Sequence, residues 1–167
     1  MIHVAGGTYT EFCHFPHWHE LYGSGGRAAA VLAGLSEKVV LSTFSSADGI
    51  DRRKFLGDAF GFDLANIEVA PEVVFEYLHP LRCRSVSPSK EQINTNRVLK
   101  ITDSIVLRFG FWEGDSQISA EFAVYDPQSP GNPVHFGANG STAEHLAIVC
   151  NFDEGKFLTG EMTQPKL

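Results

Sequence analysis

Apolar runs alternate with helix-favouring stretches along the first third of the chain. Residues 2–5 and 39–44 are short apolar runs, and both are typical of buried parallel strands. Residues 28–35 favour a helix by composition, and residues 48–60 space their large apolar side chains for one helical face. Strand, helix, strand and helix with short connections predict right-handed parallel βαβ units.

The middle of the chain breaks this rhythm. Residues 73–79 alternate in polarity and place Phe75, Tyr77 and His79 on one face of a strand. A polar stretch that contains prolines follows, and residues 98–102 are a further candidate strand. We interpret the two segments as an antiparallel excursion from an α/β core.

The last third of the chain returns to apolar strands. Residues 104–109, 119–125 and 146–150 each predict one. The last of the three is apolar on both sides, which is typical of a strand in the interior of a sheet. Residues 141–144 have the spacing of a capping box and predict a short helix before that strand.

Composition narrows the possible functions. The chain has 167 residues, which suffice for one domain with a substantial core, and 43% of them are hydrophobic. The formal net charge of −7 argues against nucleic acid or an anionic membrane as a partner. No apolar run approaches the roughly 20 residues of a membrane-spanning helix. Three widely spaced cysteines and a start without signal character predict free thiols and a cytoplasmic protein.

The glycines of residues 22–26 form the first candidate site. Gly25 and Gly26 lead into the predicted helix, where glycine lets a ligand approach unpaired backbone N–H groups. The segment is not a P-loop, because no Lys-Ser or Lys-Thr pair follows at the required spacing, and it is not a dinucleotide fingerprint. A flexible turn is the alternative interpretation.

Two further candidates also have structural explanations. The strand face that carries Phe75 and Tyr77 fits stacking on a sugar or a base, and equally fits packing onto the core. Asn151 and Glu154 have the spacing of a helix-capping box, with Asn as the N-cap and Glu at the third helical position. Their place directly after a buried strand favours a functional role in addition.

Three histidines near the amino terminus, His14, His17 and His19, suggest a metal site at first sight. Neutral imidazole is a common metal ligand, but these spacings match no standard zinc pattern. We therefore expect these side chains to lie at the surface or to contact a substrate, and we expect no directly bound metal.

Several landmarks occur in a fixed order along the chain. They are residues 6–11, 25–35 and 39–51, the strand end at Asp126, and the Asn-x-x-Glu motif that begins at Asn151. Together they resemble the amino-terminal signature region of the ribokinase-like (PfkB) kinases. The resemblance implies an α/β fold, a three-layer α/β/α sandwich with a mostly parallel sheet and a small β-sheet lid.

The same resemblance implies a domain organisation and roles for individual residues. Residues 1–167 would be a portion of one domain, with the carboxy-terminal half absent. Glu11 falls where the family usually has an Asp that holds substrate hydroxyls, and Gly25 and Gly26 match the di-glycine beneath the substrate. Asn151 and Glu154 match the pair that orders water, magnesium and phosphate. The lid would comprise approximately residues 9–22, 73–86 and 97–102, with Phe75 and Tyr77 facing the substrate.

The family transfers the γ-phosphate of ATP to a hydroxyl of a sugar, a nucleoside or a vitamin, and an Asp after a Gly-Ala-Gly motif acts as the base. This sequence has no Gly-Ala-Gly-Asp segment. ATP and magnesium are implied cofactors, but the chain does not contain the family's nucleotide site. We expect the amino-terminal portion of a small-molecule kinase, either truncated or completed by a second-half polypeptide, with a homodimer through the lid as a further possible assembly.

Two other functions stay open. One is a non-catalytic module that binds a small molecule and has lost phosphoryl transfer. The other, more remote, is an unrelated α/β protein with a His-based metal site.

Overall fold

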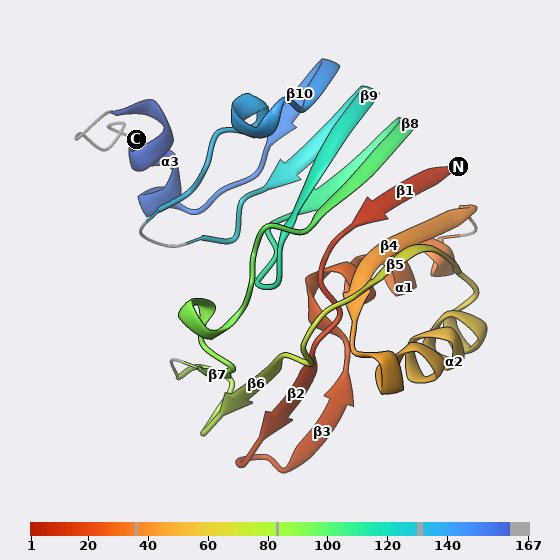
Figure 1. Ribbon diagram of the computed structural model, residues 1–167, viewed down its shortest axis with the longest axis vertical. Helices are drawn as coiled ribbons and strands as arrows, with labels where there is room; N and C mark the ends of the chain where they lie inside the picture. Colours follow the sequence, from red (N-terminus) through yellow and green to blue (C-terminus); the bar gives the residue numbers. More distant parts are fainter. Residues whose placement is uncertain (36, 83, 130–131, 161–167) are drawn as a thin grey trace.

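The computed structural model describes residues 1–35, 37–82, 84–129 and 132–160, which form two β-sheets. The larger sheet has six parallel strands in the order β10-β9-β8-β1-β4-β5. The smaller sheet has four strands in the order β3-β2-β6-β7 and lies below the large one in Figure 1. This arrangement confirms the predicted α/β fold class, with a mostly parallel sheet and a small accessory sheet.

The first half of the large sheet follows the predicted βαβ pattern. Two helices, α1 and α2, pack on one face of its strands. Val4, Leu41 and Leu64 point to this face from adjacent strands and meet apolar side chains of both helices. Burying one such side chain stabilises the fold by roughly 2–3 kcal/mol. The elements are β1 (Ile2–Ala5), α1 (Gly23–Gly34), β4 (Val39–Ser45), α2 (Ile50–Phe60) and β5 (Asp63–Val69).

The second half of the large sheet consists of β8 (Val98–Phe109), β9 (Asp115–Asp126) and β10 (Thr142–Ile148). β8 and β9 pair in parallel from end to end, although only residues 110–114 connect them. A straight strand of this length measures about 40 Å, whereas such a short connection spans only about 20 Å. Both strands must therefore bend back, so that the end of β8 approaches the start of β9.

Side-chain burial and one ion pair locate this bend. In β8 the buried positions are Leu99 and Ile101 before the middle of the strand, and Val106 and Arg108 after it. Alternation along an unbent strand would keep one parity throughout, so the change of parity marks the bend. The guanidinium of Arg108, near the end of β8, donates to the carboxylate of Asp115, at the start of β9, at 2.8 Å.

The first halves of β8 and β9 thereby cover the face of the large sheet that α1 and α2 leave open. Leu99, Ile101 and Ile118 pack in one buried cluster with Ala5 and Phe44 from the first half of the sheet. The segment predicted as a lid strand at residues 97–102 therefore belongs to the large sheet. Its alternation predicted a strand correctly but carried no information about the neighbouring strand.

β10 forms the edge of the large sheet and departs from two predictions. Residues 141–144 were predicted to start a helix, but Thr142 begins this strand and residues 142–144 belong to it. The apolar run predicted as an interior strand ends at Ile148, and β10 pairs with β9 alone within the described ranges. Leu146 and Ile148 are each 43% exposed. An apolar strand edge of this kind is unusual in a monomer, because it offers unpaired backbone groups to other chains.

The small sheet combines strands from two separate parts of the chain. β2 pairs with β3 in antiparallel orientation and with β6 in parallel orientation, and β7 pairs antiparallel with β6. Residues 18–21, next to the histidines, form β3. The strands are β2 (Thr10–Cys13), β3 (Trp18–Leu21), β6 (Val74–Tyr77) and β7 (Ser85–Ser87).

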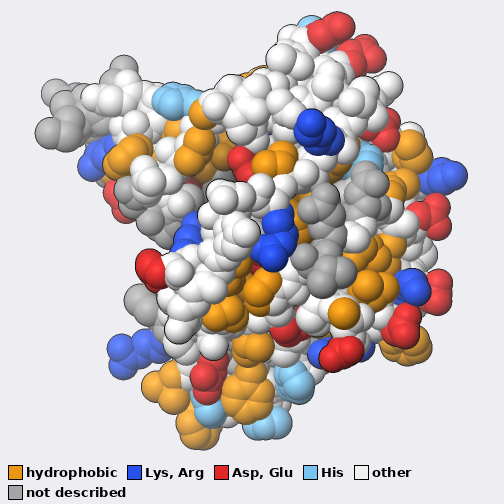
Figure 2. All heavy atoms as spheres, viewed as in Figure 1, with side chains coloured by type: hydrophobic (Ala, Val, Ile, Leu, Met, Phe, Trp, Pro, Cys, Tyr) orange, Lys and Arg blue, Asp and Glu red, His pale blue; other side chains and the backbone are white. Residues whose placement is uncertain are grey.

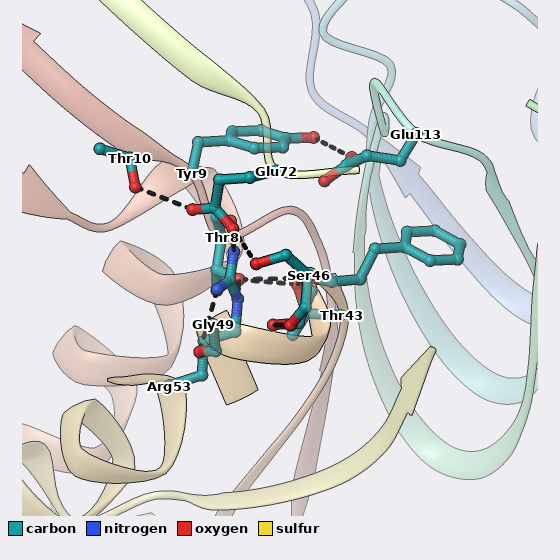
Figure 3. A network of polar contacts seen from close by, with 11 residues as sticks. Thr8, Tyr9, Thr10, Thr43, Ser46, Gly49, Arg53, Glu72 and Glu113 are labelled. Atoms are coloured by element: carbon teal, nitrogen blue, oxygen red, sulfur yellow. Dashed lines mark hydrogen bonds and ion pairs between the residues drawn. The ribbon is translucent and has the colours of Figure 1, made fainter. Parts of the chain in front are cut away.

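Buried polar contacts around Arg53 of α2 fix the small sheet to the large one (Figure 3). The Arg53 guanidinium donates to the Thr8 hydroxyl at 2.6 Å and to the Thr8 carbonyl at 2.8 Å. It also lies 3.5 Å from the Glu72 carboxylate, which accepts from Thr10 at 2.8 Å and from Ser46 at 2.7 Å. Because Thr8 precedes β2 and Glu72 precedes β6, one arginine holds the starts of two strands of the small sheet.

Candidate functional site

A pocket of about 750 Å³ lies between the small sheet and the carboxyl ends of three strands of the large sheet. Its walls include residues 110–112 after β8, 126–129 at the end of β9 and 149–151 after β10. The opposite wall comes from β2, β6 and the start of α1. In open α/β sheets ligands bind beyond the carboxyl ends of the strands, so the pocket has the position that this architecture favours for a ligand.

Most of the predicted site residues line this one pocket, although they come from distant parts of the sequence. The structure brings together Glu11 of β2, Phe75 and Tyr77 of β6, and Asn151 and Glu154 at the start of α3 (Phe152–Thr159). Their roles in binding are still predictions, because contact with a shared cavity does not by itself assign a function.

The carboxylate of Glu11 is buried and engaged by its own chain. Its Oε1 accepts from the Arg27 guanidinium at 2.7 Å and from the Gly23 backbone N–H at 3.0 Å, and its Oε2 also pairs with Arg27. Glu11 is 3% exposed, whereas the side chain of Arg27 is 52% exposed. The hydrogen bonds that Arg27 donates to Glu11 raise the pKa of Arg27. Glu11 therefore orients a cation at the pocket wall.

Gly25 and Gly26 lie inside α1 and do not line the pocket. A Cβ on Gly25 would stand 2.5 Å from the carbonyl carbon of Gly6, so this glycine permits close helix–strand packing. The helix begins earlier than predicted, and Gly23 and Ser24 take the place at the pocket wall. The glycine-rich segment therefore reaches the pocket through Gly23, whereas Gly25 and Gly26, the glycines predicted to lie beneath a substrate, do not line it.

The two aromatic residues of β6 differ in their exposure. The ring of Phe75 is 8% exposed and packs 4.7 Å from the ring of Tyr9 and 6.0 Å from that of Trp112. Tyr77 is only half-buried, and its desolvation raises the pKa of its hydroxyl. Phe75 thus serves as a core residue that also borders the pocket, while Tyr77 offers more open surface to a ligand. His79, the third residue of the predicted face, lies outside the pocket lining.

Asn151 and Glu154 form the predicted capping box of α3. The Asn151 side chain accepts from the Glu154 backbone N–H at 2.9 Å, and the Glu154 carboxylate accepts from the Asn151 backbone N–H at 3.0 Å. The other oxygen of Glu154 accepts from the Ser129 N–H at 2.8 Å. Glu154 is 2% exposed. The motif therefore has a definite structural role, which is to fix α3 to the loop after β9.

Asp126 adds a second carboxylate at this end of the pocket. Burial raises its pKa, hydrogen bonds from Gln128 oppose that shift, and repulsion from Glu154 adds to it. Mg²⁺ is usually held by one or two carboxylates together with phosphate oxygens and water. Asp126 is a carboxylate of this kind at the pocket wall, whereas both oxygens of Glu154 already accept backbone N–H groups. Within the described ranges no group of three or more His, Cys, Asp and Glu residues is arranged to hold a metal ion.

The sequence analysis missed the basic side chains of the pocket. Arg84 and Lys90 come from the stretch between β6 and β8, where no motif marks them, and Arg108 comes from β8. Arg108 is 2% exposed, with the rings of Tyr125 and Phe136 at 4.6 and 5.3 Å from its guanidinium carbon. Only Arg27 had a signal, because it directly follows the glycine-rich segment.

A buried acid also lies next to the pocket. The hydroxyl of Tyr9 donates to the Glu113 carboxylate at 3.0 Å (Figure 3). The same hydroxyl accepts from the Trp112 backbone N–H at 3.0 Å. Burial raises the pKa of Glu113 to about 7, although hydrogen bonds and the charge of Arg53 oppose this. Nothing in the sequence pattern predicts this group, since its burial results from the bend of β8 and β9.

The histidines lie away from the pocket. Figure 2 shows histidine and hydrophobic side chains side by side at the end of the molecule formed by the small sheet. His14, His17 and His19 surround the ring of Phe12, with ring centroids 4.7, 5.3 and 6.1 Å away. None of the three lines the pocket. This arrangement agrees with the prediction of a surface position.

Comparisons with known proteins give similarity at the level of structure alone. No protein-family model and no curated protein matches the sequence. Among solved structures, a pyrophosphate-dependent kinase in the ribokinase family, complexed with a pyrophosphate analog and myo-inositol, is 12% identical with a TM-score of 0.44. That match covers 77% of this chain and 62% of the other.

Two further similar structures have names in the same family of kinases. Ribokinase from Cryptococcus neoformans, in complex with ADP, is 11% identical with a TM-score of 0.47, over 89% of this chain and 71% of the other. Adenosine kinase from Sinorhizobium meliloti is 10% identical with a TM-score of 0.44, over 85% and 54%.

The chain spans only 60 to 64% of the length of the first three solved proteins that it matches. The family named from the sequence landmarks is thus also the family of these similar structures. Such low identities and TM-scores say nothing about the activity or ligand of this chain.

One observation bears on location. Each helix in the described part of the chain falls short of the length and apolar character needed to cross a membrane.

Proposed function

We propose that this chain contributes the acceptor side of a phosphoryl-transfer site, in which phosphate passes from ATP to a hydroxyl of a small sugar, nucleoside or related metabolite. One observation carries the proposal: a single pocket beyond the strand ends brings the aromatic residues of β6 together with the Asn-x-x-Glu motif of α3. The sequence landmarks of the ribokinase-like kinases, in their order along the chain, support the same assignment.

The two ends of the pocket would have different tasks. Tyr77 and Phe75 offer aromatic surface on which a sugar ring or base stacks, and Arg27 offers donors to its hydroxyls. Asp126 and Glu154 lie at the other end, where a magnesium ion shared with the transferred phosphate would neutralise its charge. Positioning and charge stabilisation supply nearly all the catalysis in this chemistry. The base and the nucleotide site would come from residues other than these 167.

A non-catalytic binding module is the second candidate, and the hydrogen bonds of the acidic residues favour it. Both oxygens of Glu154 accept backbone N–H groups, and both oxygens of Glu11 pair with Arg27. Carboxylates used in this way hold the pocket in shape without taking part in a reaction. The two candidates share the ligand pocket and differ in whether phosphate and magnesium bind to it.

The first arm of the test is acceptor binding. Ribose, fructose, myo-inositol and adenosine are titrated into the purified chain by calorimetry. We expect one of them to bind, and we expect Tyr77→Ala to weaken that binding at least tenfold. His79→Ala is the matched control, because His79 follows the same strand outside the pocket. Failure of these four probes, and of the charged sugars fructose 6-phosphate and gluconate, to bind would refute the proposed acceptor pocket.

The second arm separates the kinase from the binding module. Magnesium with pyrophosphate serves as a probe that carries two phosphates without a base. Binding that Asp126→Asn weakens supports phosphoryl transfer at this site. Acceptor binding with no detectable magnesium pyrophosphate binding supports the non-catalytic module.

A further inference from the structure

Two of the four basic residues that line the pocket are not neutralised by an acidic partner. Of the four, Arg27 pairs with Glu11 and Arg108 pairs with Asp115. The other two, Arg84 and Lys90, form no ion pair within the described ranges of the chain. The chain as a whole is acidic, with 20 Asp and Glu against 13 Lys and Arg, so carboxylate partners are plentiful elsewhere.

Both cations are held against an aromatic wall. The guanidinium carbon of Arg84 lies 5.3 Å from the ring centre of Phe75, and the ammonium nitrogen of Lys90 lies 5.0 Å from that of Trp112. Such cation–π contacts fix the position of a charge without neutralising it. The two rings pack edge to face at 6.0 Å, and both rings and both cations line the same cavity.

The supporting ring of Trp112 is itself anchored. Its indole N–H donates to the Pro88 carbonyl at 3.0 Å, and its backbone N–H donates to the Tyr9 hydroxyl at 3.0 Å. The first bond joins the Lys90 segment to the loop between β8 and β9, and the second joins that loop to the residue before β2. The cationic wall is therefore built from three separate segments that are tied together.

The charges of the pocket are arranged with opposite signs at its two ends. Asp126 and Glu154 lie beside the carboxyl ends of β9 and β10 and have no basic partner at ion-pair distance among the residues that the structure describes. Arg84 and Lys90 lie beside the small sheet. A neutral polyol would need only hydrogen-bonding groups at the second end. Two unneutralised cations there match a ligand with negative charge.

We propose that the ligand of this pocket is a small polyol with an anionic group, phosphate or carboxylate, which Arg84 and Lys90 bind while its carbon skeleton lies against Phe75 and Trp112. The proposal rests on the proposed function, since it specifies the acceptor of that same pocket. Arg84 binds two oxygens of the anion through its planar fork, and Lys90 adds a point charge. The hydroxyl that receives phosphate then points toward Asp126 and Glu154.

The experiment compares charged and neutral forms of the same sugar on the full chain. Fructose 6-phosphate, fructose, gluconate, glucose and inorganic phosphate are titrated by calorimetry at low and at high salt. We expect a charged form to bind on the order of 10- to 100-fold more tightly than its neutral counterpart, as hydrogen bonds to charged groups imply. High salt should remove part of that preference, because the two cations are exposed. The phosphate and gluconate arms decide between the two kinds of anion.

Variants test the two residues directly. Arg84→Gln with Lys90→Gln should abolish the preference for the charged form and leave the binding of the neutral form within about threefold. Arg82→Gln with Lys100→Gln removes the same charge from exposed residues outside the pocket and should leave the preference intact. Equal loss in both double variants would assign the effect to overall charge and overturn the proposal.

The outcomes separate this inference from the proposed function. Neutral and charged forms that bind equally overturn the anion site and leave the acceptor pocket in place. Inorganic phosphate that binds as tightly as the sugar phosphate overturns the polyol part of the proposal. No binding by any of the sugars, charged or neutral, refutes the proposed function and this inference together.

Discussion

The two halves of the large sheet present the same face to different surroundings. In the first half, β1, β4 and β5 lie under α1 and α2, and Leu41 is fully buried. In the second half, Ile105, Phe122 and Val124 point to the corresponding face and are 42, 45 and 38% exposed. One continuous parallel sheet is therefore covered along half of its width and bare along the other half.

The difference follows from the lengths of the connections. A parallel crossover needs a dozen or more residues and usually carries a helix, as the connections through α1 and α2 do. The connection from β8 to β9 has only residues 110–114, and the one from β9 to β10 includes no more than a short 3-10 helix, Phe136–Asn139, in the described residues. The second half folds its own strands over one face, and among the described residues no element covers the other. Parallel sheets are normally covered on both faces, so the bare face is the one open to another chain.

The largest expected effect is a contrast in stability between matched truncations in the two halves. Leu41→Ala removes a fully buried side chain and should cost roughly 2–5 kcal/mol of unfolding free energy. Ile105→Ala removes a side chain that is 42% exposed and should cost less than about 1 kcal/mol. Urea unfolding followed by circular dichroism measures both. Equal losses would mean that the bare face is covered in solution.

The same contrast explains which parts of the fold the sequence could predict. In the first half, strands and helices follow each other locally, and their apolar pattern and composition predicted β1, α1, β4 and α2, whereas β5 had no predicted counterpart. In the second half, residues 98–102 were predicted to be a separate lid strand. The bend in β8 leaves buried and exposed side chains alternating on each side of it, so the pattern does not show that the two parts form one strand. The apolar run at 146–150 predicted an interior strand, since apolar composition does not reveal whether a neighbour is present.

The site was predictable only where a local motif marks it. The capping box at Asn151 and Glu154 and the alternating aromatic residues of β6 have local spacing rules, and the structure places all of them at one pocket. Arg84, Lys90 and Glu113 reach the pocket region through loops and the strand bend, which no spacing rule describes. The sequence does not distinguish Gly25, which permits close helix–strand packing, from Gly23, which lines the pocket, because both are glycines at the start of the same helix.

The second prediction concerns Glu113, which links the bend of the second half to Tyr9 at the root of the small sheet. Its folded pKa of about 7 lies above its ordinary value of 4.5, so the folded state holds a proton that the unfolded state has released between these pH values. The unfolded state then binds fewer protons, and stability falls as pH rises through this window, by about 3 kcal/mol in total. Below pH 4.5 and above pH 7 the contribution of Glu113 to the unfolding free energy should not change with pH.

Glu113→Gln provides the matched variant, because the amide keeps an acceptor for the Tyr9 hydroxyl and does not titrate. The difference in unfolding free energy between the wild type and this variant should shrink or reverse as pH is raised from 4.5 to 7. Denaturant unfolding at half-unit pH steps measures it. If the difference in unfolding free energy between the wild type and Glu113→Gln stayed constant from pH 4.5 to 7, the raised pKa of a buried Glu113 would be contradicted.

The third prediction uses the bare face itself. We expect the isolated chain to self-associate through it, and Phe122→Lys, which places a charge in the centre of this face, should weaken association about tenfold. Phe55→Lys is the control, because Phe55 is 74% exposed on α2, in the covered half. Sedimentation velocity over a range of protein concentrations measures the association. A wild type that stays monomeric at all concentrations, or an equal response to both variants, would contradict a role for the bare face.

The smallest expected effect tests α3, which lies at the edge of the bare half. Asn151→Ala removes the N-cap acceptor of the Glu154 N–H and should cost about 1 kcal/mol of stability. Asn151→Asp keeps a capping oxygen and adds a negative charge near the helix amino terminus, so its stability should equal that of the wild type. The added charge should also weaken binding of free pyrophosphate at this end of the pocket. A loss of pyrophosphate binding in Asn151→Asp without a loss of stability would separate the ligand role of this residue from its capping role, whereas loss of both together would reduce the motif to a structural cap.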